Sequence, residues 1–387
     1  MIKVTHIITG LECGGAEMML YKLLHRLEGE IAAEVISLTD DGSLGPSIRQ
    51  LGVPVNVLGM RRGLPNPWAV GKLAQHLRRS RPNVVQTWMY HADLLGGLAT
   101  KLGGAVPLAW GIRQSNLDPV HSKRLTRLTV RLCARLSDGL PQRIVCCSKE
   151  AARIHVEMGY AKEKITIIPN GFDLEAFRPD PGARTTLRRE LGLAEEAPLI
   201  GMVARFDAQK DHQTFIGAAA LVLRRRPDVK FVFVGDGATD SNVTLLGWLR
   251  AAGVADRFLL LGRREDVTAV LNALDIASLS SAFGEGFPNV VGEAMACGVP
   301  CVVTDVGDSA WLVGGAGRVV PARNPEALAR AWLDLLESDS SERRAIGAIG
   351  RARVSEQFEI GIIAHRYRDL WLEMSVAAQT ETRVRAG

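Results

Sequence analysis

Short runs of β-branched and other apolar residues alternate along the chain with segments in which apolar residues recur every three or four positions. This alternation predicts buried parallel strands joined by helices, and therefore an α/β fold. The strand candidates are 2–8, 33–38, 53–58, 83–87, 106–110, 143–147, 165–168, 198–203, 230–234, 258–261, 275–279, 300–304 and 318–320. The helical patterns include 15–27, 67–79, 91–102, 120–137, 211–226, 240–252, 265–273 and 290–297.

The pattern breaks near the middle of the chain. Pro169–Asp173 is a turn cluster, and Arg178–Gly182 is typical of a linker. Since 387 residues exceed one ordinary core, we expect two domains, 1–180 and 181–387. Each is predicted to be a doubly wound, Rossmann-like parallel sheet facing a central cleft, with ligands at the carboxyl ends of the strands. A final helical segment at about 355–375 is a candidate to cross back onto the first domain.

Composition and charge narrow the function. Apolar residues make up 47% and charged residues 23%, as in globular proteins. Residues 1–180 carry 23 Lys and Arg against 16 Asp and Glu, whereas the remainder carries 24 against 26. This asymmetry indicates an anionic partner for the first half, such as a membrane surface, a lipid phosphate or an acidic acceptor. Nucleic acid is disfavoured, because no basic motif is interleaved with aromatic residues.

The cysteines and the first residues indicate a cytosolic protein. Met1–Gly10 is typical of a first buried strand and too short for a signal peptide, and no apolar run approaches the ~18 residues that span a bilayer. The six cysteines form neither metal-binding pairs nor a disulfide framework, so we expect reduced thiols. They are Cys13, Cys133, Cys146, Cys147, Cys297 and Cys301.

The most informative motif is a pair of carboxylates, Glu285 and Glu293, around a Gly-Phe-Pro turn. Pro288 suits the first turn of a helix, and Asn289 and Val290 then present backbone N–H groups where an anion binds well. Glu285 is expected just before this helix and Glu293 about two turns into it. One carboxylate can therefore face a sugar while the other reaches a ribose. This arrangement suits a nucleotide diphosphate sugar.

Other residues of the second half follow predicted strands. Arg205 and Lys210 lie where cations can clamp a diphosphate and neutralise a leaving group. Gly235 begins a Gly-Asp-Gly turn, but Asp240 breaks the dinucleotide fingerprint and so disfavours an oxidoreductase. Arg263 lies where a nucleotide base could run along the backbone. For the three cations, the competing interpretation is a solvated loop residue.

The first half has its own candidates. Gly14 and Gly15 link the first strand to the first helix, where glycines allow a phosphate or sugar to approach the backbone. A tight packing turn is the alternative. His91 follows a strand, and its neutral imidazole can bond a donor-sugar hydroxyl, although most lone histidines are structural. Glu17 and Asp93 are expected to be first-turn or capping carboxylates.

A basic amphipathic helix is predicted further along. Its arginines share one stripe and its leucines the adjacent one. The arginines are Arg124, Arg127, Arg131 and Arg135, and the leucines are Leu125, Leu128, Leu132 and Leu136. Such a helix can rest on an anionic membrane. In the competing interpretation the leucines face the protein core and the arginines are only solvated.

Together these segments resemble the retaining glycosyltransferases of family 4, which have the GT-B fold. The similarity spans nearly the whole chain, and the Glu-x7-Glu motif with its Ala-Met-Ala-Cys-Gly-x-Pro continuation is its most specific part. The segments that carry it are Gly14–Glu17, the region ending at His91, Ile168–Asp173, Arg205 with Lys210, and Glu285–Pro300. One departure is Trp311, near where many relatives have a glutamate, which puts acid chemistry or loop anchoring at that position in doubt.

The resemblance implies roles for these residues. Arg205 and Lys210 would bind the donor diphosphate, Glu293 the ribose, and Glu285 the sugar near its 3- and 4-hydroxyls. His91 would contact the transferred sugar, and Gly15 would approach the diphosphate. The remaining donor contacts would come from Gly14, Gly235, Arg263, Gly286, Phe287, Pro288, Asn289 and Val290. Family members need no metal, and retention is thought to proceed by front-face attack, with the leaving phosphate accepting the proton of the acceptor.

We therefore predict a cytoplasmic transferase, peripheral on the inner membrane face, that moves a hexose-type sugar from a nucleotide donor. A UDP-sugar is the favoured co-substrate and a GDP-sugar the next, with no other cofactor. A glycan or lipid-linked acceptor is expected. The alternatives are a sugar-nucleotide epimerase, a glycogen-synthase-like polymerase, or an inactive partner subunit that binds nucleotide sugar or membrane.

Overall fold

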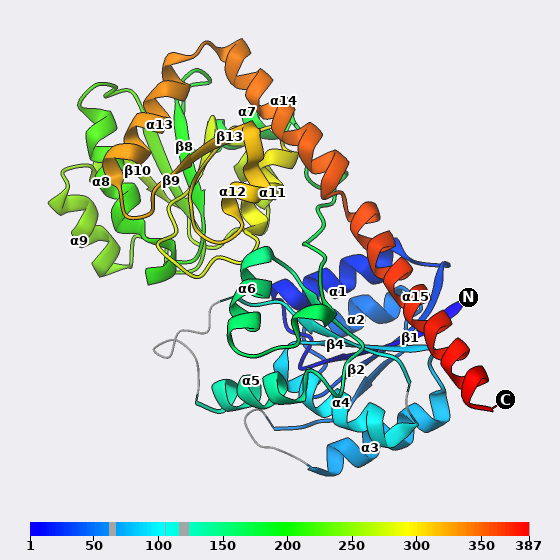
Figure 1. Cartoon of the computed structure of the whole chain (residues 1–387). Coiled ribbons are helices and arrows are strands. Elements are labelled where there is room, and N and C mark those ends of the chain that lie inside the picture. Colours follow the sequence, from blue (N-terminus) through cyan, green and yellow to red (C-terminus); the bar gives the residue numbers. More distant parts are fainter. Residues whose placement is uncertain (62–66, 105, 116–123, 387) are drawn as a thin grey trace. The chain divides into compact units, whose positions relative to one another are not determined.

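The structure is a computed structural model that describes residues 1–61, 67–104, 106–115 and 124–386 (Figure 1). The predicted helix 120–137 therefore begins outside the described residues, at 120–123. The chain forms two compact units. Unit 1 comprises Met1–Gly171 and Ile360–Gly387, and unit 2 comprises Phe172–Glu359.

Unit 1 is built on a parallel sheet. Its described residues form seven strands in the order β3-β2-β1-β4-β5-β6-β7. The strands are β1 (Ile2–Ile8), β2 (Ile31–Ser37), β3 (Val55–Val57), β4 (Val84–Trp88), β5 (Leu108–Ile112), β6 (Arg143–Cys146) and β7 (Ile165–Ile167). All strands predicted for the first half are confirmed within a few residues, because β-branched apolar runs of this length fit a sheet that is covered on both faces.

Helices cover both faces of this sheet. They are α1 (Gly15–Arg26), α2 (Leu44–Gln50), α3 (Pro67–Ser80), α4 (Tyr90–Gly103), α5 (Arg124–Leu136), α6 (Lys149–Glu157), the 3₁₀ turn η1 (Lys162–Lys164) and α15 (Ile360–Ala386). Figure 1 shows α3, α4 and α5 on one face and α1, α2 and α15 on the other. Two separate apolar clusters correspond to these faces, as expected for a three-layer α/β domain.

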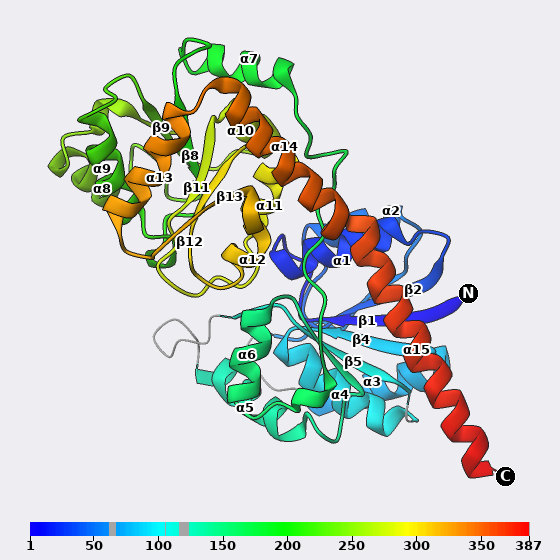
Figure 2. The same ribbon diagram turned by 45° about the horizontal axis from the view of Figure 1, so that its top comes forward.

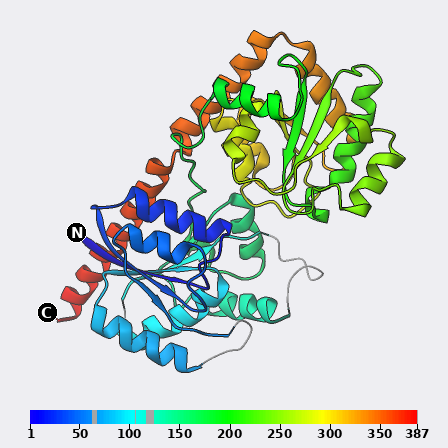
Figure 3. The same cartoon turned by 180° about the vertical axis from the view of Figure 1, so that it is seen from behind.

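The last helix, α15, belongs to unit 1 although it follows unit 2 in sequence. It packs beside α1 and against β1 and β4 and lies alongside α1 in Figures 1 and 3. Buried Tyr367 and Trp371 anchor it, and the indole N–H of Trp371 donates to Oε1 of Gln86 at 3.1 Å. Burial of these two large rings is worth several kcal/mol by area.

Unit 2, all of whose residues are described, contains a six-stranded parallel sheet in the order β10-β9-β8-β11-β12-β13. The strands are β8 (Leu199–Val203), β9 (Lys230–Val234), β10 (Phe258–Leu260), β11 (Ile276–Leu279), β12 (Cys301–Thr304) and β13 (Gly317–Val320). The strand order reverses between β8 and β11, which is the point where ligands bind in doubly wound sheets. The predicted strands of this half are confirmed as well.

Helices also cover both faces of the second sheet. They are α7 (Pro181–Glu190), α8 (His212–Leu223), α9 (Val243–Ala251), α10 (Val267–Ala273), α11 (Asn289–Ala296), α12 (Ser309–Val313), α13 (Pro325–Glu337) and α14 (Ser340–Gln357). Short 3₁₀ turns are η2 (Ala208–Lys210), η3 (Ala255–Arg257) and η4 (Gly314–Ala316). Figure 2 shows α8, α9 and α13 on one face and α10, α11 and α14 on the other.

The two units meet in sequence after Gly171 and again after Glu359, whereas the sequence pattern places the division after residue 180. The reason is aromatic packing. Phe172 is buried in unit 2, where its ring stacks on Phe287 at 6.0 Å and its N–H donates to the carbonyl of Phe358 at 2.8 Å. Both crossings are therefore held together at the edge of unit 2.

The linker expected at Arg178–Gly182 is wrong in its second part. Asp180 caps helix α7, because its side chain accepts the N–H of Ala183, and Pro181 occupies the first helical position. An acidic cap followed by proline is a helix start. The Pro-Gly pair therefore begins an element here and does not interrupt one.

Candidate active site

The loops after β8 and β11 meet through an ion pair. Lys210 ends η2, and its Nζ lies 2.5 Å from Oε1 of Glu285, in the loop before α11. The two side chains are only 17% and 6% exposed. Ser281 Oγ donates to the same carboxylate oxygen at 2.5 Å. A charged pair with so little water around it holds a defined geometry, because each partner would otherwise be a poorly solvated charge.

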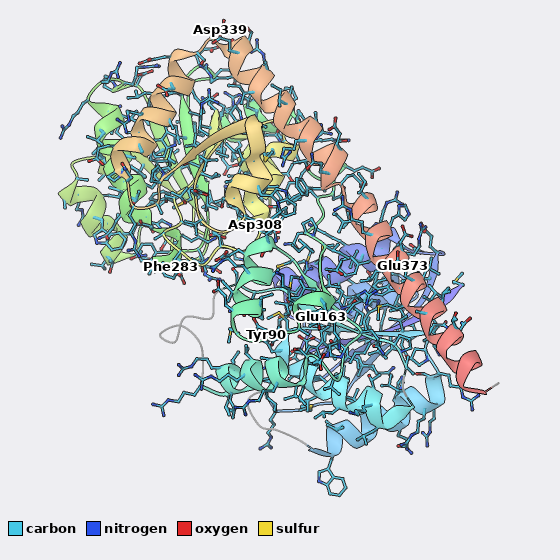
Figure 4. The ribbon with its side chains drawn as sticks, in the orientation of Figure 1. Tyr90, Glu163, Phe283, Asp308, Asp339 and Glu373 are labelled. Atoms are coloured by element: carbon cyan, nitrogen blue, oxygen red, sulfur yellow. The ribbon has the colours of Figure 1, made fainter. Side chains whose placement is uncertain are left out.

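Backbone contacts fix the loop that carries Glu285. The side-chain amide of Gln209 donates to the carbonyl of Gly284 at 3.0 Å, and the N–H of Ala282 donates back to the carbonyl of Gln209 at 2.8 Å. On the far side, Asp308, labelled in Figure 4, donates its N–H to the carbonyl of Gly286 at 3.0 Å. The loop is thus tied to the loops that follow both neighbouring strands.

Gly307 makes a contact that the sequence analysis missed. Its φ of 59° lies in the left-handed region, and a Cβ there would sit 2.0 Å from the carbonyl oxygen of Glu285. Only glycine fits this position without displacing the loop. A glycine three residues beyond a strand was the available signal, but nothing in its spacing identifies Glu285 as the neighbour.

Helix α11 follows this loop, with Pro288 as its N-cap. Phe287 and Pro288 are buried, whereas Asn289 and Val290 are half-buried. Glu293 is the fifth residue of α11 and so lies about one turn from its start, not two as expected. The difference arises because Gly286 and Phe287 form a bend and Pro288 is an extended N-cap, so the Gly-Phe-Pro turn contributes no helical residues.

Arg205 lies in a different setting from Lys210. Its side chain is 62% exposed, and its Nε lies 3.4 Å from Oδ2 of Asp207. Arg263, after β10, is also exposed. Gly235 follows β9 and has φ 141°. Its N–H donates to the carbonyl of Gly262, and a Cβ on Gly235 would lie 2.3 Å from the carbonyl oxygen of Ala204. The loops after β8, β9 and β10 therefore approach one another through backbone.

In unit 1, the candidate residues lie at the carboxyl ends of β1 and β4. Gly14 is the N-cap of α1, and Gly15 is its first residue, with Glu17 in the first turn as predicted. His91 is the second residue of α4 and is half-buried. Burial lowers the pKa of His91, so its imidazole is neutral near pH 7. A neutral ring can both donate and accept a hydrogen bond.

Asp93 has more contacts than a first-turn carboxylate needs. It is fully buried, and its Oδ1 accepts the hydroxyl of Thr87 at 2.5 Å and the N–H of Gly111 at 3.2 Å. Burial raises the pKa of Asp93 to about 8, and the bonds from Thr87 and Gly111 oppose that rise only in part. The sequence analysis did not anticipate this role, because a buried acid cannot be told from an exposed one by spacing.

The basic helix α5 leaves three of its four leucines exposed. Leu125, Leu128 and Leu132 are 49%, 63% and 40% exposed, whereas the buried residues of α5 are Val130, Cys133 and Ala134. The interpretation in which the leucines face the core is therefore wrong for these three, whereas half-buried Leu136 does pack against the core. The neighbouring Arg124, Arg131 and Arg135 are exposed, and Arg127 is half-buried.

No helix among the described residues is both long and apolar enough to cross a bilayer. Likewise, the described part of the chain contains no cluster of three or more His, Cys, Asp or Glu side chains suited to a metal ion.

Comparison with protein families decides the identity. Residues 13–176 match the model of "Glycosyltransferase Family 4", and residues 197–338 match "Glycosyl transferases group 1". The two matches together span most of both units. The chain belongs to the family 4 glycosyltransferases. The prediction from the Glu-x7-Glu motif and its accompanying loops is thereby confirmed at the level of the family, and the chain is a glycosyltransferase.

Individual relatives agree with this assignment. The transferase is 26% identical over 305 residues, 78% of each chain, to the Escherichia coli UDP-Gal:alpha-D-GlcNAc-diphosphoundecaprenol alpha-1,3-galactosyltransferase. It is 26% identical over 352 residues, 87% of this chain and 90% of the relative, to the Campylobacter jejuni N,N'-diacetylbacillosaminyl-diphospho-undecaprenol alpha-1,3-N-acetylgalactosaminyltransferase.

A solved structure agrees in fold. Anabaena Alr3699/HepE in complex with UDP matches the transferase with a TM-score of 0.83 and 23% identity, over 96% of this chain and all of that one. The two parallel-sheet units are those of the GT-B fold, as predicted. In the transferase, Trp311 packs edge-on against Phe287 at 5.6 Å and its carbonyl accepts from Arg353 at 2.6 Å. Trp311 therefore packs against the loop before α11.

Proposed function

We propose that the transferase moves a hexose from a nucleoside diphosphate sugar to a glycan or lipid-linked acceptor, with retention and without a metal ion. UDP is the favoured nucleotide and GDP the next. The observation that carries this proposal is the sheltered pair of Lys210 and Glu285 at the carboxyl ends of two adjacent strands. Ligands bind at this edge in doubly wound sheets.

Glu285 and Lys210 would bind different parts of the donor, the sugar and the diphosphate. Both bonds to Glu285, from Lys210 and from Ser281, end on Oε1, which leaves Oε2 for a sugar hydroxyl. The ammonium of Lys210 is held by that carboxylate and stays available to a diphosphate. Arg205 can turn toward the same anion, since its side chain is 62% exposed and its Nε lies 3.4 Å from half-buried Asp207. Glu293, one turn into α11, would bind the ribose.

The chemistry then needs no protein nucleophile. The bond between the sugar's anomeric carbon and the leaving phosphate oxygen breaks, and a bond to the acceptor oxygen forms on the same face. The acceptor's proton passes to the leaving phosphate. Lys210 stabilises the negative charge that develops on this phosphate, which is a contribution worth about 3–4 kcal/mol when one well-placed donor is lost. His91 would contact the transferred sugar from unit 1.

The acceptor class is inferred from the relatives. The Escherichia coli and Campylobacter jejuni enzymes are named for acceptors on undecaprenol diphosphate, and the first is named for UDP-Gal. Unit 1 of the transferase carries the excess of Lys and Arg. A lipid diphosphate would be attracted to that charge.

The test is a thermal-shift screen with UDP, GDP, ADP, dTDP and CMP, with and without EDTA, followed by transfer assays with the stabilising nucleotide's sugars. We expect stabilisation by UDP that EDTA does not change. Selective stabilisation by GDP would replace the favoured base. A shift that EDTA abolishes would reject metal independence, and no shift with any nucleotide would favour an inactive partner subunit. Sugar-nucleotide conversion without an acceptor would favour the epimerase.

We also propose that unit 1 rests on an anionic membrane through α5. The three exposed leucines lie beside the exposed arginines, and no Asp or Glu interrupts the helix. Leucines can enter the lipid interface while the arginines meet the phosphates. Near an anionic surface each basic residue is worth about 1 kcal/mol.

Vesicle sedimentation tests this surface. Arg131→Gln should weaken binding to phosphatidylglycerol vesicles by about fivefold and should not change binding to phosphatidylcholine alone. Leu128→Ser should also weaken binding to phosphatidylglycerol vesicles, because it removes an apolar side chain from the lipid interface. Leu102→Ser, at an exposed leucine of α4, is the matched control. Equal sedimentation of all variants on both vesicle types would reject the membrane contact and leave α5 as a solvated helix.

A further inference from the structure

The turn that presents His91 is strained. Met89, between β4 and α4, has φ 74° and ψ 154°, a combination that is almost confined to glycine. Its N–H donates to the carbonyl of Gly111 at 2.9 Å, and its carbonyl accepts the N–H of Asp93 at 2.9 Å. Such a conformation costs about 1–3 kcal/mol and persists only where the surroundings over-determine it.

Asp93 supplies much of that constraint. Through Oδ1 it joins Thr87 on β4 to the N–H of Gly111 on β5, the residue whose carbonyl accepts the N–H of Met89. Gly111 must itself be glycine, since a Cβ there would lie 2.4 Å from the carbonyl of Thr87. The ends of two strands and the first turn of α4 are therefore closed around one buried carboxyl group.

Tyr90, the residue before His91, is also held by side-chain contacts. The hydroxyl of Tyr90, labelled in Figure 4, lies 2.9 Å from Nε2 of His155 in α6, and the two rings stack at 5.6 Å. Nδ1 of His155 lies 2.7 Å from the carbonyl of Ala151 and so carries the proton, which leaves Nε2 to accept from Tyr90. Tyr90, Ala92 and Asp93 are all buried, whereas His91 is half-buried.

We infer that Asp93 is a positioning residue, which holds the strained turn at Met89 so that the imidazole of His91 keeps one orientation toward the donor sugar. This inference rests on the proposed contact of His91 with that sugar. Asp93 itself touches no substrate in this assignment. It acts by closing the ends of β4 and β5, and a misplacement of His91 by about 1 Å is enough to slow transfer substantially.

A double-mutant cycle tests the inference. Asp93→Ala should lower kcat about tenfold or more, with little change in KM for the nucleotide sugar, because the diphosphate is bound by unit 2. The double variant Asp93→Ala/His91→Ala should be no slower than His91→Ala alone, since both changes remove the same contact. Asp93→Asn should restore most of the activity, because its amide oxygen can still accept from Gly111.

A control separates positioning from general destabilisation. Thr100, buried in the same helix, donates only to the carbonyl of Gly96. Thr100→Ala should lower the melting temperature and leave kcat unchanged. Losses that multiply in the double variant, or a folded Asp93→Ala enzyme with normal kcat, would overturn the inference. A silent His91→Ala variant would instead reject the sugar contact within the proposed function, while UDP stabilisation of unit 2 would show the donor site intact.

Discussion

In unit 2 the loops after β8 and β11 meet through Lys210 and Glu285, an ion pair 2.5 Å long whose side chains are 17% and 6% exposed. In unit 1 the ends of β4 and β5 meet through Asp93, which is fully buried and, with a pKa raised to about 8 by burial, neutral near pH 7. Under the proposed function, full charges are kept where the phosphate of a donor would be neutralised. Where only geometry is required, a neutral hydrogen bond avoids the several kcal/mol that a buried charge costs.

The largest effect on activity is expected from Lys210→Ala. Under the proposed function, loss of the ammonium removes the stabilisation of the leaving diphosphate, and we expect kcat to fall by about a hundredfold or more. The fold should be retained with reduced stability, because the variant leaves the carboxylate of Glu285, only 6% exposed, without the cation beside it. The measurement is initial transfer rate together with thermal melting.

Arg225→Ala is the matched control for that variant. Arg225 pairs with Glu337 at 3.0 Å on the surface of the same unit, and such exposed pairs contribute little. Its activity should stay near normal. A folded Lys210→Ala enzyme with normal kcat would reject the phosphate-neutralising role and leave the ion pair as a structural one.

A smaller effect is expected from Gly307→Ala, which leaves both charges in place. The added Cβ would overlap the carbonyl of Glu285, and φ is positive there, so we expect the free energy of unfolding to fall by about 1–3 kcal/mol and activity to fall with it. In Gly247→Ala, within α9, the new methyl meets nothing within 4 Å, and the change should stabilise by up to about 1 kcal/mol. Urea denaturation compares the two. Equal stability of both variants would show that the loop shifts without cost.

The smallest predicted effect is a pH dependence of stability caused by a buried neutral histidine of unit 1. Burial lowers the pKa of His6 in unit 1 to about 3, against 6.5 when unfolded, although the charge of Glu34 opposes the shift. Between these values the unfolded chain binds the extra proton, so stability is lost as pH falls below about 6.5, by at most about 1.4 kcal/mol per pH unit.

His6→Asn tests this dependence. The asparagine oxygen can still accept the indole N–H of Trp88, which lies 3.3 Å from Nδ1 of His6. The difference in urea midpoint between pH 7 and pH 5 should shrink in this variant. Exposed His25→Asn is the control. An unchanged pH difference in His6→Asn would mean that other groups, such as His155 with its pKa lowered to about 4 by burial, set the acid sensitivity.

The sequence predicted local features well. The strands were found because apolar runs flanked by turn residues leave a period that survives without tertiary information. The motif from Glu285 to Glu293 was found because a Gly-Phe-Pro turn followed by an apolar helix is itself a local pattern. The predicted position of Glu293 was wrong for a local reason as well. Glu293 lies one helical turn into α11 and not two, because the Gly-Phe-Pro segment adds no helical residues.

Long-range features could not be predicted in the same way. The exposure of Leu125, Leu128 and Leu132 depends on which side of α5 meets α4, and an amphipathic stripe allows more than one choice. The division of the chain at Phe172 depends on Phe287 and Phe358, more than a hundred residues further on. The order of apolar and polar residues along the chain does not show which distant residues come into contact.

The amino-acid sequence alone determined the two α/β units, their strands and the family to which the transferase belongs, because periodicity and compact motifs are properties of neighbouring residues. Only the tertiary structure shows that Oε1 of Glu285 accepts from Lys210, that Gly307 leaves room for that loop, and that buried Asp93 accepts the N–H of Gly111. These contacts join the ends of strands that lie apart in sequence. Their existence follows from strand order, which places distant loops at one edge of a sheet.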